Sequence, residues 1–275
     1  LVQMGWIWGI GFLTGIATSL IGGALGDRFG AKWTLLVCCF LSGITGALRG
    51  LSGDFLTLAA TAFLYGLVPT AIPMNVHKTC GVWFSGRHLG LANGIVSAGM
   101  ALGFLLGSLL SATVLSPWLG GWRQVLFLYG ALSVVVGVFW SFTREVPASE
   151  RTPSREEKVP LRDGLPYVAR IRNVWLLGLT LLGISGCTYG TLGYLPLYLR
   201  RIGWPETFAD VAMATFHGVS LVATIPMVML SDRLGSRKGI LMVGAVMISA
   251  GIALLSLSGG NLVWAAVVIA GVVRD

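Results

Sequence analysis

The sequence predicts an all-α polytopic membrane protein that is built from two similar halves. Apolar residues make up 55% of its 275 residues and charged residues only 11%, whereas a soluble domain carries about 25% charged residues. The apolar residues come in runs of about twenty, the length that crosses roughly 30 Å of hydrocarbon. A short charged motif also occurs twice, each time at the end of such a run. Because lipid cannot satisfy exposed backbone groups, we expect every run to be a helix.

The apolar runs predict the order of the membrane helices along the chain. We expect them at residues 4–25, 33–51, 55–76, 89–114, 124–142, 174–198, 206–230 and 239–257, with one more beginning near Leu262. A polar stretch broken by prolines, residues 144–172, separates them and predicts a linker. It divides the chain into an N-terminal membrane half (1–143, helices 2–6 of a complete fold) and a C-terminal half (173–275, helices 7 to part of 10).

The basic residues predict the orientation of these helices. Arg28 and Lys32 lie in the first loop, Lys78 lies at the end of the third span, and many more basic residues lie in the linker, all on one side. Since Lys and Arg accumulate in cytoplasmic loops, we expect a multi-pass protein of the cell (inner) membrane, with the motif loops and the linker in the cytoplasm. The net charge of +8 is accounted for by these loops, so we expect no nucleic-acid partner.

The repeated motif predicts how the two halves are related. Its first copy runs from Gly23 to Lys32 and its second from Val228 to Lys238, and Asp27 aligns with Asp232. An even number of predicted helices separates the copies, so both face the same side. Halves of equal orientation are parallel repeats related by an axis along the membrane normal. Two six-helix halves would need one helix before Leu1, and the rest of the tenth helix and two more after Asp275.

The motif resembles that of the major facilitator superfamily of secondary transporters, whose loop after the second helix carries Gly-x-x-x-Asp-Arg-x-Gly-x-Lys/Arg. The resemblance implies the major facilitator fold, two six-helix halves related by pseudo-twofold symmetry, incomplete in this chain. It also implies a cytoplasmic conformational latch in which Asp27 holds the N-terminal end of a facing helix or an Arg of the other half. The alternative is that the motif sets only the turn and the topology. The latch residues would be Gly23, Asp27, Arg28, Gly30, Lys32, Asp232, Arg233, Gly235, Arg237 and Lys238.

Two departures from the family pattern limit what the resemblance implies. Ala62 stands where many members have an Arg in the fourth helix, so no role of that Arg is carried over. Phe104 stands where many drug antiporters have a Pro in the fifth helix. The missing Pro makes a drug/proton antiporter of that type less favoured.

Ionisable residues inside the bilayer indicate function by default, and we expect no buried Asp or Glu in the spans before the tenth. Arg274 and Asp275 fall near mid-membrane if the tenth helix is continuous, where a guanidinium suits a carboxylate; a structural ion pair is the alternative. His217 can accept a proton or bind substrate, or be a neutral buried side chain. The remaining candidates for substrate binding are Asn75, Tyr189 and Tyr194, for which helix-to-helix hydrogen bonds are the alternative.

These features favour a secondary active transporter that moves a small solute, with an organic anion as one option, by alternating access. A proton-coupled efflux antiporter and a non-transporting membrane sensor of the same fold are left open. We expect no enzyme activity, because no nucleophile elbow, phosphate loop or metal-ligand cluster is visible. No cofactor and no metal are expected. The expected partners are the solute, a coupling proton or other ion as in a symporter, and the lipid bilayer, with the protein a monomer.

Overall fold

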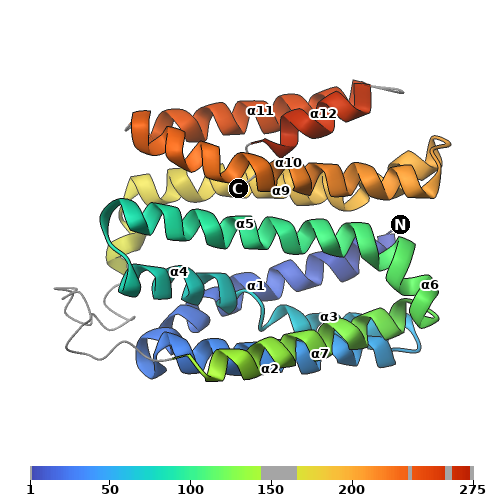
Figure 1. Ribbon diagram of the computed structural model, residues 1–275, viewed down its shortest axis with the longest axis horizontal. Helices are drawn as coiled ribbons and strands as arrows, with labels where there is room; N and C mark the ends of the chain where they lie inside the picture. The colour runs from blue at the N-terminus through green and yellow to red at the C-terminus, as the bar shows by residue number, and fades with distance from the viewer. Residues whose placement is uncertain (1, 144–165, 235–236, 258–261, 273–275) are drawn as a thin grey trace. The chain divides into compact units, whose positions relative to one another are not determined.

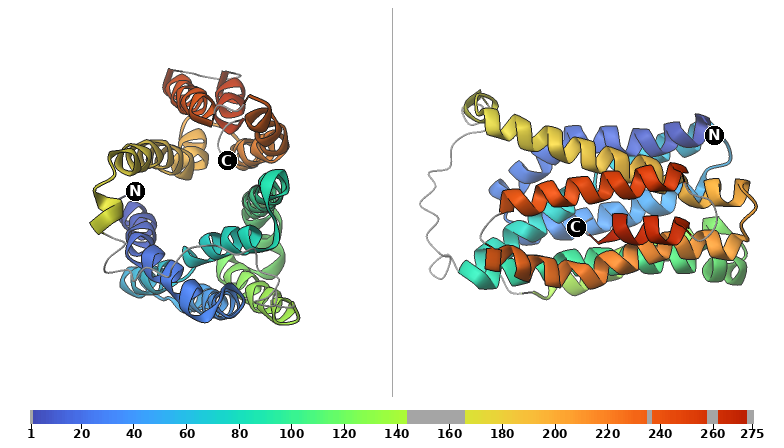
Figure 2. Two further views of the ribbon diagram at one scale, coloured as in Figure 1. Left: turned by 90° about the vertical axis from the view of Figure 1, so that its left-hand side faces the viewer. Right: turned by 90° about the horizontal axis from the view of Figure 1, so that it is seen from above.

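A computed structural model describes residues 2–143, 166–234, 237–257 and 262–272, and these residues are almost entirely helical (Figure 1). They form two compact units. The first comprises residues 1–85 and 115–154, and the second comprises residues 86–114 and 155–275. Within each unit the helices run roughly side by side (Figure 2). The boundary that the linker predicts at residue 143 stays a prediction, whereas contacts group the helix of residues 86–110 with the second unit.

The first unit is held together by helices whose backbones approach closely. It contains α1 (Val2–Phe29), α2 (Ala31–Leu48), η1 (Arg49–Leu51), α3 (Phe55–Gly66), α4 (Ala71–Trp83), α6 (Ser116–Leu119) and α7 (Trp122–Ser141). Between α2 and α7, a Cβ added to Gly43 would lie 2.7 Å from the carbonyl oxygen of Gly130. Ser133 donates to the Cys39 carbonyl across the same pair at 2.9 Å. Small residues that admit a neighbouring backbone are typical of helix packing in lipid.

The second unit has a conventional apolar core. It contains α5 (Gly86–Leu110), which a π-helical stretch (Ser111–Leu115) continues, then α9 (Arg172–Arg201), α10 (Glu206–Leu234), α11 (Arg237–Leu257) and α12 (Leu262–Gly271). Phe216 and Leu199 are fully buried against Val263 and Val267. Along the other side of α10, a Cβ added to Gly218 would lie 3.6 Å from the side chain of Leu105 of α5, an ordinary van der Waals distance.

The predicted multi-span helical architecture is confirmed. Among the described residues, seven helical segments are long and apolar enough to cross a membrane, and the number is eight if the bent α1 counts as one span. The predicted helix beginning near Leu262 is present as the shorter α12. The third predicted span, 55–76, continues further than expected, because α4 ends at Trp83.

Two irregularities interrupt the helices of the first unit. The third span is broken between Gly66 and Ala71, where Pro69 has no N–H to continue the helical hydrogen bonds. The second irregularity is a bend of 45° in α1 between Ile16 and Ile21. Thr14 precedes the bend and Thr18 lies within it, and each hydroxyl donates to a carbonyl of the preceding turn of α1. Such side-chain bonds to the backbone often bend helices.

Candidate functional site

The strongest site in the first unit is a closely packed contact between α1 and α4, at the end of α1 that carries the first motif. A Cβ added to Gly22 would lie 2.5 Å from the Cβ of Ala71, and one added to Gly26 would overlap Oδ1 of Asn75. A side chain at position 22 would displace the backbone of α4, and one at position 26 would displace the amide of Asn75. We call the contact formed by Gly22, Gly26, Ala71 and Asn75 the α1–α4 seam.

Asn75 is the polar centre of the α1–α4 seam. It is completely buried, and its Nδ2 donates to the carbonyl of Gly22 at 3.1 Å and to that of Ala71 at 2.8 Å. Its Oδ1 lies against Gly26 and has no hydrogen-bond partner among the described residues. Asn75 was a candidate for substrate binding, and the structure shows the alternative, a hydrogen bond between helices. Substrate contact by Asn75 stays a prediction.

The first motif continues this contact beyond the seam. Asp27, at the end of α1, forms an ion pair with Lys78, one turn beyond Asn75 on α4. The expected partner of Asp27 was a facing helix end or an Arg of the other half, whereas the partner that the structure shows belongs to the same unit. Gly30, between α1 and α2, has a φ of 87°, in the left-handed region that favours glycine. The Cζ of Arg28 lies 5.4 Å from the ring centroid of Phe29.

The second copy of the motif can be located only by its backbone. Asp232 and Arg233 lie in the last turn of α10, and Arg237 begins α11, but their side chains lie outside the description. Gly235 lies outside the described residues. Lys238 is exposed at the start of α11. The latch function of either copy stays a prediction.

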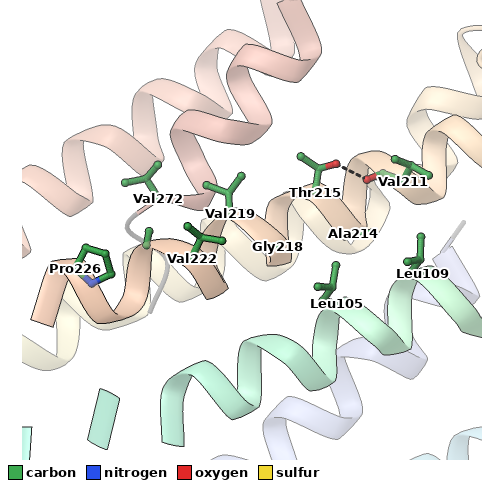
Figure 3. A pocket seen from close by; sticks show the side chains of 11 residues that line it. Leu105, Leu109, Val211, Ala214, Thr215, Gly218, Val219, Val222, Pro226 and Val272 are labelled. Carbon is green, nitrogen blue, oxygen red and sulfur yellow. Dashed lines mark hydrogen bonds between the residues drawn. The ribbon is translucent and has the colours of Figure 1, made fainter. Parts of the chain in front are cut away.

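The second unit contains an apolar cavity of about 660 Å³ (Figure 3). Leu105 and Leu109 of α5 form one wall, and one face of α10 forms most of the rest. Thr215 is the polar residue of this lining, and its hydroxyl donates to the carbonyl of Val211 in the same helix at 2.8 Å. Val272, just after α12, also lines the cavity. The residues that line it include none of the predicted substrate-binding residues.

His217 projects from a different face of α10. It is 5% exposed, and its ring stacks on Phe104 of α5, with centroids 5.3 Å apart and planes inclined by 20°. The ring of Phe216 meets it edge-on, also at 5.3 Å. Phe104, noted in the sequence as a departure from Pro, is therefore the contact between α5 and the histidine. This packing fits the alternative of a buried structural imidazole, and a role in proton or substrate binding stays a prediction.

The remaining substrate-binding candidates are not brought together by the described structure. Tyr189 and Tyr194 lie on α9, where Tyr189 is exposed and Tyr194 is half-buried. Arg274 and Asp275 lie outside the described residues. Val272, which lines the cavity, precedes Arg274 by two positions.

Sequence reasoning was wrong about buried carboxylates. Asp210, in the first turns of α10, is 7% exposed, although the spans before the tenth were expected to contain no buried Asp or Glu. The Nη2 of Arg200, at the end of α9, donates to both carboxylate oxygens of Asp210 at 2.9 Å. The short connection between the predicted spans 174–198 and 206–230 was the available signal, because it places the end of one helix beside the start of the next.

Comparisons with known proteins agree on one family. The profile of the Major Facilitator Superfamily matches residues 1–274. A probable nitrate/nitrite antiporter of Thermus thermophilus is 28% identical over 249 residues, which cover 86% of this chain and 54% of that protein. A probable sulfoacetate transporter of Cupriavidus necator is 24% identical over 240 residues, which cover 81% of this chain and 54% of that protein. The chain thus spans about half the length of these curated relatives.

The solved structures show the fold. The structure of the Major Facilitator Superfamily transporter FucP in its outward conformation superposes with a TM-score of 0.72 and 14% identity. It covers 100% of this chain and 73% of the FucP chain.

Proposed function

We propose, because this chain belongs to the Major Facilitator Superfamily, that it is part of a secondary active transporter that carries a small anionic solute across a membrane. The family match over residues 1–274 carries the proposal. The membrane-spanning helices support it. Two halves that rock about a central site would expose that site alternately to the two sides of the membrane.

The anionic character of the solute is supported by chemistry. The two curated relatives are named for nitrate or nitrite and for sulfoacetate, and all three solutes are oxyanions. Arg274 supplies a matching group in this chain, since a guanidinium binds carboxylate, nitrate or sulfonate oxygens in pairs.

We assign the first motif to the conformational change rather than to solute binding. Asp27 and Asn75 both join the end of α1 to α4, through the ion pair with Lys78 and the hydrogen bond to Gly22. These contacts would make α1 and α4 move as one body. We further propose that the motif loops and the linker face the cytoplasm, as the distribution of basic residues indicates.

Uptake of labelled nitrate and sulfoacetate into proteoliposomes that contain the full-length protein tests this proposal. We expect saturable uptake, and we expect Arg274→Ala to raise the KM at least about tenfold, the factor of about 1.4 kcal/mol. Arg201→Ala is the matched control, because Arg201 is an exposed arginine at the end of α9. Arg200 would be a poor control, since its loss leaves the carboxylate of Asp210 buried and unpaired.

Equal effects of the two arginine substitutions would remove Arg274 from the solute site. Absence of flux for a broad panel of anions would contradict the transport function and favour the sensor. Exchange of one anion for another is a second candidate transport mode, because the Thermus relative is named a nitrate/nitrite antiporter. Preloading the vesicles with nitrite or imposing a pH gradient separates exchange from proton-coupled symport.

A further inference from the structure

The first unit contains an apolar groove of its own, on α1 and α2. It measures about 550 Å³ and is lined by two stripes of side chains and by the turn between α3 and α4. The hydroxyl of Thr34 donates to the carbonyl of Gly30 at 2.9 Å, and that of Thr18 donates to the carbonyl of Thr14 at 2.9 Å. Because these hydroxyls are already bonded, the groove presents a hydrocarbon surface. Its residues are Thr18, Ile21, Gly22, Leu25, Phe29, Trp33, Thr34, Val37, Cys38, Leu41, Leu67, Val68 and Ala71.

The groove is open along one side and has the depth of one lipid leaflet. Ile21 of α1 is 57% exposed, and Val37 of α2 is 48% exposed. Along the path of α1, the stretch from Phe29, beside the α1–α2 turn, to Thr18, within the bend, measures about 16 Å at 1.5 Å per residue. Half of the hydrocarbon core of a bilayer is about 15 Å. With the motif turn at the membrane surface, as the basic residues predict, a groove of this length reaches toward the bilayer centre and matches one extended acyl chain.

The surface end of the groove is positively charged. The guanidinium of Arg28 lies over the ring of Phe29, which lines the groove, and Lys32 lies in the first turn of α2. The nearest acidic residue in this turn, Asp27, is paired with Lys78. The first turn of α2 contains no acidic residue, and its N-cap Gly30 offers no side-chain cap. The positive end of the α2 dipole thus adds to the two basic side chains.

We propose that this groove binds an anionic phospholipid, with one acyl chain between α1 and α2 and the phosphate group at Arg28 and Lys32. The apolar length of the groove accounts for the chain, and the charge at its end selects an anionic head group over a zwitterionic one. A basic residue near an anionic membrane surface is worth a factor of about five in binding. The site is independent of the transported solute.

Photocrosslinking in the full-length protein tests this site. A photoreactive amino acid replaces Val37 in the groove or, as the matched control, Val136 on α7, which is 51% exposed. The protein is reconstituted into phosphatidylcholine vesicles that contain one part in ten of phosphatidylglycerol. We expect the lipid adducts at position 37 to be enriched in phosphatidylglycerol about fivefold or more over the adducts at position 136.

Charge substitutions then locate the head group. Arg28→Gln and Lys32→Gln, each introduced singly, should reduce the enrichment at position 37, whereas Arg28→Lys and the control Arg201→Gln should preserve it. Raising the salt concentration from 20 to 500 mM, with both basic residues intact, should also reduce it. This salt measurement does not depend on whether the charge variants fold.

Three results would overturn the proposal. Equal phosphatidylglycerol content at positions 37 and 136 would mean that the groove does not select lipids. A phosphatidylglycerol enrichment at position 37 that changes neither with the salt concentration nor with the Arg28 and Lys32 substitutions would mean that the head group binds elsewhere. Crosslinks from position 37 to the polypeptide in place of lipid would mean that a protein segment covers the groove.

Discussion

The α1–α4 seam makes a quantitative prediction for Gly26→Ala. The new Cβ would overlap Oδ1 of Asn75, and Asn75 cannot move aside without losing its bonds to the carbonyls of Gly22 and Ala71. Overpacking of this kind costs about 1–3 kcal/mol. Hydrogen bonds in membrane proteins average about 0.6 kcal/mol each, and an alanine in a helix regains about 1 kcal/mol over glycine. The net expected loss of stability is about 1–3 kcal/mol.

Gly9→Ala is the matched control for this substitution. Gly9 lies in the same helix, and a Cβ added there would meet no atom within 4 Å. It should therefore show only the gain of helix propensity, so the two variants should differ by about 2–4 kcal/mol. In a protein of this size or larger, 1 kcal/mol changes the melting temperature by about 2 °C. Thermal unfolding of the purified full-length protein in detergent should show Gly26→Ala melting at least about 4 °C below Gly9→Ala.

A double-mutant cycle separates the contact from a general effect on α1. Asn75→Ala removes the amide that the new methyl group would strike, so the combined variant should be more stable than the sum of the two single changes by about 1–2 kcal/mol. If Gly26→Ala and Gly9→Ala have the same melting temperature, or if the effects of Gly26→Ala and Asn75→Ala simply add, then Asn75 does not occupy the space beside Gly26 and our account of the seam is wrong.

Two further predictions concern charged groups at helix ends. Asp210→Ala should lose about 1.5–3 kcal/mol of stability, the range for hydrogen bonds to charged groups, because Arg200, the side chain left without its carboxylate, is 36% exposed and can still reach water. The joint change Arg200→Met with Asp210→Leu should come close to the parent protein in the same thermal assay, and a double variant as unstable as Asp210→Ala would contradict this. Asp54 accepts hydrogen bonds from the N–H of Thr57 at 2.7 Å and from its hydroxyl at 2.8 Å, which hold the pKa of that carboxyl below its ordinary value. Because the pKa of Asp54 is lower in the folded state, the ionised N-cap stabilises the protein above the ordinary carboxyl pKa, and this contribution is lost as the pH falls through the folded pKa. Asp54→Asn should therefore flatten the acid side of a stability-versus-pH curve. An unchanged curve would show that the charge of this cap does not contribute to stability.

The helices could be predicted because their cause is local. Runs of apolar residues without charge must be helical in lipid, and the bounds of α2, α7 and α11 lie within a few residues of the expected spans. The positions where helices break depend on contacts with other helices and not on the local sequence alone. Pro69 lies in a break, but Pro196 and Pro226 lie inside continuous helices. The break at Pro69 is accompanied by a contact from the next residue, Thr70, whose hydroxyl lies 3.1 Å from that of Thr18 on α1.

The candidate site was less predictable because its contacts join residues that are distant in sequence. Nothing in the motif indicates that Asp27 pairs with Lys78, which sequence analysis placed simply at the end of a span. Nor does composition show that Asn75 lies against Gly26. Asp210 was overlooked because it lies among apolar residues near a helix start, where a carboxylate normally reaches water. Its partner Arg200 ends the preceding helix, and only the packing of α9 on α10 brings the two together.

The most direct test of the account is the side of the membrane that the two motif turns face. Lys32 and Lys238 are replaced one at a time by cysteine in a full-length protein from which the native cysteines, including Cys38, Cys39, Cys80 and Cys187, have been removed. Gly53, in the exposed connection between η1 and α3, is the control. A membrane-impermeant maleimide is applied to intact cells and to inverted vesicles. We predict that positions 32 and 238 react only in inverted vesicles and that position 53 reacts only in intact cells. Labelling of positions 32 and 238 from opposite sides would contradict the parallel arrangement of the two halves, and with it the alternating-access mechanism.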